Sequence, residues 1–354
     1  MTKNIKNFLF STTRQWNPGD EIILLGLINL LKHKSYNFNP IIFNRNPDIR
    51  PNFMILNPFL KYRFNNTFLI NMINSFVKIS FFDNSAGPNF NYKIIDRAYI
   101  AGSPEWYSLR MYELYNKIQK NNIPYEIHGI GLSHNMSINK LPSFVKNFLK
   151  NSDLITVRDR NTFNLLSEHY KVKYITCPSL FCSAPYENNN KITHLGLTYV
   201  DSRSPIGNSI DESMYKNLIN LYNKLILNLN FKISFICHYV SEIDRCRDLF
   251  PSNHIYYHYD ARSYLDIYKN FDFVIGPRLH GIASSVSQGI PSILISHDCR
   301  SDAGKLFGID VFNLNSNTYS KIMKILRNYN SIKNLRANII KNYKSSKSNY
   351  LKLL

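Results

Sequence analysis

An arginine and a histidine stand two residues apart, directly after an apolar run, in the segment FVIGPRLHGIASSVSQGIPSILISHD at residues 273–298. Arg278 carries a planar, permanently charged guanidinium that can hold a carboxylate or a phosphate through two parallel hydrogen bonds. His280 can give or take a proton near neutral pH. The pair therefore predicts a site that binds an anion and moves protons.

The flanking pattern places this pair between a strand and a helix. FDFVIG is typical of a buried strand, and residues 281–288 predict a short helix that ends at Gly289. Arg278, Leu279 and His280 then lie in the turn, where free amide groups and the helix dipole favour an anion. The alternative is structural: Arg278 pairs with a carboxylate and His280 caps the helix. Spacing alone leaves both interpretations open.

Short apolar runs alternate with helical patterns along most of the chain. Helices are expected between several of the runs, one of them over 105–119. The expected strands are NFLF, PIIF, VKISFF, AYIAG, YEIHGIG, LITVRD and KYITC, then, after a polar stretch at 183–193, HLGLTYV, KISFICHY, HIYYHY, FDFVIG, PSILIS and VFNLN. This alternation predicts an α/β protein in which two Rossmann-type domains with mainly parallel sheets face each other. A ligand would bind in the interdomain cleft, at the carboxyl ends of the strands.

The length of the chain limits its domain organisation, and its net charge limits the kinds of partner that it could bind. A chain of 354 residues suits two domains, and we expect an N-terminal domain at 1–185, a second at 190–315 and a basic helical segment at 316–354. The 43 basic and 24 acidic residues give a net charge of +19 that is spread over the chain. A nucleic-acid-binding protein would concentrate its cations, so small anionic substrates are favoured over nucleic acid. The dense C-terminal cations leave contact with an acidic membrane surface open.

Several classes are disfavoured by what the sequence lacks. The five cysteines form no CxxC pair, which fits a reducing compartment, and no signal peptide or spanning run is evident, so a cytoplasmic protein is expected. No GxxxxGK[ST], GxGxxG or Asp-x-Asp motif occurs, which argues against P-loop enzymes, dinucleotide dehydrogenases and metal-dependent glycosyltransferases. His254 and His258 have a spacing suited to a metal pair on a helix, but HIYYHY predicts a strand, so no metal is expected.

Five blocks, in order along residues 8 to about 310, resemble the polysaccharide pyruvyl transferase family. The most specific is GPRLHGIASSVSQGIPSILISHDCRS, with its arginine-leucine-histidine triplet and the later Gly-x-Pro. Two departures are the turn AGSPEW, which is poorer in glycine than the family form, and CPSLF, which lacks an aspartate. The other four blocks are NPGDE at 17–21, AYIAGSPEW, IPYEIHGIGLS and SDLITVRDRNT.

The resemblance implies a GT-B-like fold and transfer of pyruvate from phosphoenolpyruvate, as co-substrate without a further cofactor, to a sugar of a surface glycan such as a capsule or exopolysaccharide. It implies that Arg278, with Leu279, His280 and Gly281, holds the donor and that His280 is the general acid or base. Arg158 would face them as a second anion clamp; a salt bridge to Asp153 or Asp159 is its structural alternative.

On the acceptor side, the resemblance suggests that Asp20 or Glu21 binds or deprotonates the sugar hydroxyl, whereas capping of the first long helix is the structural interpretation. His128 would line the cleft or be a satisfied core residue. Asp298 and Arg300 would pair with each other or form a wall of the site. Two other functions stay open: a GT-B glycosyltransferase that uses a nucleotide sugar, and a non-catalytic nucleic-acid-binding protein driven by the charge.

Overall fold

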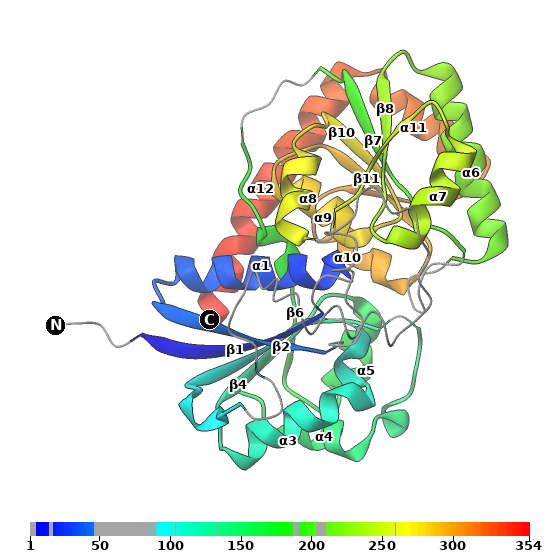
Figure 1. The fold of residues 1–354 in the computed structure, drawn as a ribbon. Coiled ribbons are helices and arrows are strands. Elements are labelled where there is room, and N and C mark those ends of the chain that lie inside the picture. Colours follow the sequence, from blue (N-terminus) through cyan, green and yellow to red (C-terminus); the bar gives the residue numbers. More distant parts are fainter. Residues whose placement is uncertain are drawn as a thin grey trace, which may run out of the picture.

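Two six-stranded parallel sheets form the framework of the protein (Figure 1). The structure is a computed structural model, and it describes residues 5–13, 17–45, 86, 90–102, 104–132, 134–186, 191–202, 210–258 and 260–354. The expected strand VKISFF, at 77–82, lies outside these residues.

The strands of the first sheet are β1 (Lys6–Thr12), β2 (Phe38–Asn44), β3 (Arg97–Ala101), β4 (Tyr125–Ile130), β5 (Leu154–Val157) and β6 (Val172–Tyr174). Those of the second are β7 (His194–Thr198), β8 (Lys232–Ile236), β9 (His254–Tyr256), β10 (Phe273–Gly276), β11 (Ser292–Ser296) and β12 (Asp310–Asn313).

The strand order gives each sheet a point where the chain reverses direction across it. The first sheet runs β2-β1-β3-β4-β5-β6, so its reversal lies between β1 and β3. The second runs β12-β11-β10-β7-β8-β9, the classical dinucleotide-fold order, and reverses between β7 and β10. In open parallel sheets a crevice forms at the carboxyl ends of the two strands that flank such a reversal. The expected α/β architecture with mainly parallel sheets is confirmed.

Parallel strands buried on both faces are read from sequence as continuous apolar runs, which is why these strands were predictable. All residues of β4, β7 and β10 are buried. The helices that cover the sheets are α1 (Pro18–His33), α3 (Tyr112–Lys120), α4 (Ser143–Lys150), α5 (Arg160–Ser167), α6 (Glu212–Asn228), α7 (Val240–Leu249), α8 (Ala261–Tyr268), α9 (Leu279–Ser287), α10 (Asp302–Lys305), α11 (Thr318–Leu326) and α12 (Tyr329–Leu353).

Two helix boundaries differ from expectation. The helix expected over 105–119 is divided into 3-10 turns at Pro104–Tyr107 and Leu109–Met111, followed by α3. Buried Trp106 donates its indole N–H to the Gly131 carbonyl at 3.1 Å, and this tertiary bond holds the first turn against the end of β4. Helix α9 begins at Leu279, two residues before the predicted start, because Ile282 N–H already reaches the Arg278 carbonyl at 2.8 Å.

Helices α1 and α12 join the two halves (Figure 1). Helix α1 follows β1 of the first sheet but packs on α8 and α9 of the second half. Helix α12 leaves the second half and runs back to the first, where the Tyr350 hydroxyl lies 2.9 Å from Nδ1 of His128 and 3.0 Å from the Thr156 hydroxyl. In the described part of the chain, none of the helices combines the length and apolarity needed to cross a bilayer.

Candidate functional site

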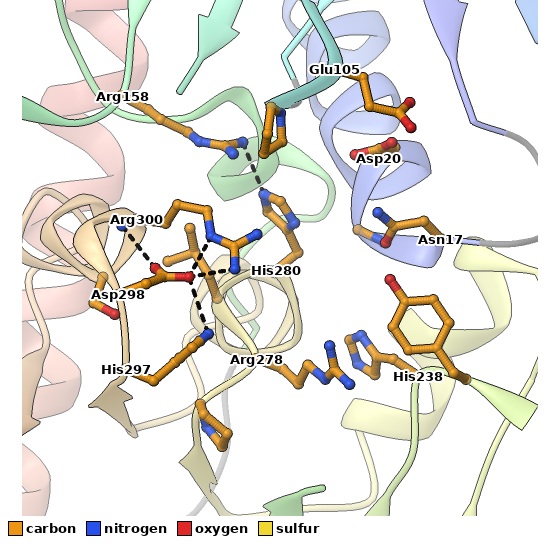
Figure 2. A pocket seen from close by; sticks show the side chains of 16 residues that line it. Asn17, Asp20, Glu105, Arg158, His238, Arg278, His280, His297, Asp298 and Arg300 are labelled. Carbon is orange, nitrogen blue, oxygen red and sulfur yellow. Dashed lines mark hydrogen bonds and ion pairs between the residues drawn. The ribbon is translucent and has the colours of Figure 1, made fainter. Parts of the chain in front are cut away.

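A pocket lies where the two strand reversals face each other (Figure 2). The first half contributes the start of α1, the turn after β3 and Arg158 after β5; the second half contributes the segments that follow β8, β10 and β11. The cavity volume is about 100 Å³, several times the space that one water molecule requires. The cleft expected from the sequence is therefore present, and both halves of the chain build it.

Arg158, which belongs to the first half of the chain, contacts His280 of the second half across the pocket. Its side chain is fully buried, and Nη1 lies 3.1 Å from Nε2 of His280 (Figure 2). Among the residues that the structure describes, its Nε and Nη2 atoms have no hydrogen-bond partner. Asp153 pairs with Arg97 at 3.0 Å instead. Asp159 caps α5 through the Thr162 amide at 2.8 Å and forms no ion pair with Arg158 among the described residues, although the charge of Arg158 acts to lower its pKa. A buried guanidinium with two unused nitrogens is costly unless an anion completes it.

His280 occupies the first turn of α9 and points toward Arg158. Because an arginine can only donate, Nε2 of His280 is the acceptor and the ring proton resides on Nδ1. Burial, and then the nearby charges of Arg158 and Arg300, hold the pKa of His280 well below its usual range. The imidazole is thus neutral at pH 7. A Cβ atom at Gly19 would collide with Nδ1 of His280, so only glycine lets the start of α1 come this close.

Arg278 is buried and already paired. It forms an ion pair with Glu242, donates Nε to the Tyr199 carbonyl at 3.2 Å and stacks 5.0 Å above the Tyr239 ring. Glu242 is fully buried, and its second oxygen accepts the amides of His238 at 3.0 Å and Tyr239 at 3.1 Å. The structural interpretation of Arg278 therefore describes part of its role, although Arg278 also lines the pocket.

Glu242 was missed by the sequence analysis. It lies three residues after Tyr239 and accepts the Tyr239 amide, as the glutamate of a capping box does. Because Tyr239 is not one of the usual N-cap residues, the sequence contains no capping signal, and it contains none for a partner 36 positions away.

The side of the pocket formed by the first half contains two carboxylates, Asp20 and Glu105, that both pair with Arg45. Buried Arg45 binds Asp20 at 2.6 Å and Glu105 at 3.2 Å. Burial raises the pKa of Asp20, Arg45 opposes that shift, and the charge of Glu105 adds to it. Glu105 is the more accessible of the two, with 24% of its side chain exposed against 3% for Asp20. Sequence reasoning selected Asp20 but missed Arg45, which belongs to no recognisable pattern, and Glu105, which lies within the block AYIAGSPEW but was not singled out there.

The third wall is a compact charged group after β11. Asp298 binds Arg300 through Nε at 2.7 Å and His297 at 3.2 Å. His297 and Arg300 hold the pKa of Asp298 well below its usual range, against the effect of burial. Both alternatives apply here, since Asp298 and Arg300 pair with each other and also line the pocket.

Other sequence-selected residues have different positions. Leu279 lines the pocket beside His280, whereas Gly281 packs behind it, where an added Cβ atom would collide with the Tyr268 hydroxyl. Glu21 is buried in α1 and does not line the pocket. His128 is fully buried, with Nε2 2.8 Å from Glu126, and does not line the pocket. This is the arrangement expected if His128 is a core residue with satisfied hydrogen bonds. His254 begins strand β9, as the aromatic pattern predicted.

Solved structures with the same architecture define the class. A UDP-GlcNAc 2-epimerase from Neisseria meningitidis bound to UDP-GlcNAc has a TM-score of 0.55 at 13% identity, with 98% of this chain and 100% of that chain covered. The Methanocaldococcus jannaschii enzyme in complex with UDP-GlcNAc and UDP gives 0.52 at 14% identity, covering 92% and 93%. An alpha-glucosyltransferase in complex with UDP gives 0.51 at 9% identity, covering 96% and 95%. The fold is thus of the GT-B type, with two facing Rossmann-like halves.

The family model for polysaccharide pyruvyl transferase matches residues 17–298, which include every residue that lines the pocket except Arg300 and Ser301. The chain belongs to the polysaccharide pyruvyl transferase family. No curated protein matches the sequence significantly.

The neutral state of His280 can be tested by NMR. We expect no protonation of His280 between about pH 8 and pH 6 in the free protein, because burial and two arginines oppose the charged ring. The His280→Gln variant assigns the signal. By linkage, the unfolded chain binds this proton more readily, so the stability associated with His280 falls progressively as the pH drops below about 6.5, toward the lower pKa of the folded state. A midpoint between 6 and 7 in the free protein would contradict the electrostatic description.

Proposed function

We propose that the protein transfers pyruvate from phosphoenolpyruvate to a sugar of a polysaccharide or glycan precursor, where it forms a ketal. The observation that carries the proposal is the fully buried guanidinium of Arg158, with two unpartnered nitrogens, beside a neutral His280. Phosphoenolpyruvate is a small donor with one carboxylate and one phosphate. The proposal uses it as co-substrate, requires no cofactor, and places the protein in the cytoplasm.

The donor would lie between the start of α9 and Arg158. The first amides of α9, at Leu279 and His280, have no acceptor within the helix and point to an anion with the positive end of the helix dipole. The guanidinium of Arg158, which lines the pocket, would supply further donors. Arg278, fixed by Glu242, and Arg300, fixed by Asp298, extend the positive wall around these groups. Together they suit a ligand with two anionic ends.

The proton balance assigns a role to His280. Ketal formation makes two carbon–oxygen bonds at C2 of the donor and breaks the bond to phosphate. The two attacking hydroxyls release two protons, of which one goes to the enol carbon C3 and the other leaves with phosphate. A bound trianion raises the pKa of His280, because it compensates the positive charges that depress it in the free protein. His280 then takes up a proton and can deliver it within the pocket.

Asp20 and Glu105 suit the acceptor side. They face the donor wall across the pocket and share Arg45, and Glu105 also pairs with Arg110 at 3.3 Å. The more exposed Glu105 can accept a proton from an attacking hydroxyl, while Asp20 and Arg45 keep it in position. Glu105 lies in the turn AGSPEW, where the sequence departs from the usual glycine-rich form of the family.

Donor binding is testable by calorimetry with phosphoenolpyruvate and, separately, UDP-GlcNAc. We expect phosphoenolpyruvate to bind and Arg158→Gln to weaken that binding by roughly 2 to 4 kcal/mol, because two charge-assisted hydrogen bonds are lost. Arg160→Gln, at an exposed position two residues away, is the matched control and should bind normally. Tight binding of UDP-GlcNAc without a response to phosphoenolpyruvate would favour the nucleotide-sugar glycosyltransferase instead.

The acceptor role is testable by mass spectrometry of a panel of simple hexosides incubated with enzyme and phosphoenolpyruvate. Glu105→Gln should lower the transfer rate by about 10²- to 10⁴-fold, because the proton acceptor is lost, and should leave the donor affinity unchanged. Glu113→Gln, at an exposed site on α3, is the control. Full transfer activity in Glu105→Gln would remove the carboxylate from the mechanism.

A further inference from the structure

A second hollow lies at the opposite end of α1 from the pocket. The last turn of α1 and the C-terminal turns of α12 form a groove, which we call the α1–α12 groove, lined by Lys32, Lys34, Tyr343, Lys344, Lys347 and Lys352. Helix α1 has 16 residues and is therefore roughly 24 Å long. That length separates the groove from the pocket, so a ligand of the groove would not compete for the donor site.

The charged side chains that line the α1–α12 groove are all basic. After Asp310 the sequence contains seven lysines and two arginines and not one acidic residue. Among the residues that the structure describes, no carboxylate forms an ion pair with any of the five lysines of the groove. Lys34 instead donates to the Leu351 carbonyl at 3.0 Å, which fixes the end of α12 beside the end of α1. The counter-ions of these lysines must therefore come from outside the described structure.

One contact within the α1–α12 groove joins two basic side chains directly. Nζ of Lys347 lies 2.8 Å from Nε2 of His33. Because lysine can only donate, His33 must accept with a neutral ring. Burial lowers the pKa of Lys347, and burial together with Lys347 lowers the pKa of His33. Among the described residues no carboxylate pairs with either of these two basic groups, and a bound anion would let His33 take up a proton as well.

The apolar face of α12 is not available for insertion into a bilayer. Ile332, Leu335, Ile339, Tyr343 and Tyr350 are buried against the rest of the protein. The side of the helix that remains exposed carries lysine heads, among them Lys344 and Lys352. A contact with lipid would therefore be electrostatic, made by ammonium groups at the headgroup level, and sensitive to salt.

We infer that the α1–α12 groove is a docking surface for the anionic headgroups of a membrane. The charge complementarity comes from five lysines around a shallow groove, none of which forms an ion pair with a carboxylate in the described part of the chain. Clusters of four to eight cations at a surface are the size that anionic bilayers attract. The surface holds the enzyme at the bilayer by one end of α1 and leaves the pocket at the other end open. This inference does not depend on which reaction the pocket performs.

Vesicle sedimentation tests the inference with the full chain. At about 0.1 M salt, the protein should sediment with phosphatidylcholine vesicles that contain phosphatidylserine, and not with phosphatidylcholine alone. Replacing Lys344, Lys347 and Lys352 together by glutamine should weaken the association on the order of 100-fold. The matched control replaces three exposed lysines of the first half, Lys120, Lys140 and Lys150, and removes the same charge.

The control set should retain most of the association, and higher salt should release the wild-type protein. Equal losses in the two sets would overturn the inference, because net charge rather than the groove would then decide binding. Equal binding to neutral vesicles would overturn it as well, since that requires apolar insertion. Tighter binding to duplex DNA than to the anionic vesicles would assign the surface to nucleic acid instead.

Discussion

The contact between Arg158 and His280 is the constraint on which the rest of the structure depends. It joins the end of β5 in the first half to the start of α9 in the second, at 3.1 Å, and leaves two guanidinium nitrogens buried without partners. Leaving buried donors unsatisfied costs about 1 to 3 kcal/mol each, so the folded protein keeps this arrangement only because the surrounding packing enforces it. In the proposed function, a small anion would satisfy those donors and the first amides of α9.

The surrounding elements hold this contact in place. Gly19 allows α1 to approach the imidazole, and Glu242 fixes both Arg278 and the loop after β8. Helix α12 returns to the first half, where the Tyr350 hydroxyl bonds His128 and Thr156 within the first sheet. His128 therefore serves the geometry of the site from a distance, through the packing of the two halves. Membrane docking at the far end of α1 would position the same rigid helix at a surface without disturbing its active end.

The sequence predicted the fold well, and the site only in part, for physical reasons. Parallel strands buried on both faces leave continuous apolar runs, such as FDFVIG, and these identified both sheets. Arg278, His280, Arg158 and Asp20 were selected from local patterns and resemblance, and the structure brings all four to one pocket. Arg45, Glu105 and Glu242 were not selected, because their roles arise from pairings between distant segments. The division of the expected helix over 105–119 has the same origin, since the Trp106 bond to Gly131 is a tertiary interaction.

In the proposed mechanism an anion binds beside the buried guanidinium of Arg158 and changes the protonation of His280. The most direct measurement is calorimetry of phosphoenolpyruvate binding near pH 7 in buffers that differ in their heat of ionisation. The account predicts net proton uptake on binding, because the anion raises the pKa of His280 toward or above neutrality, and the uptake should disappear in His280→Gln. Binding with the same heat in every buffer, or no binding at all, would contradict it.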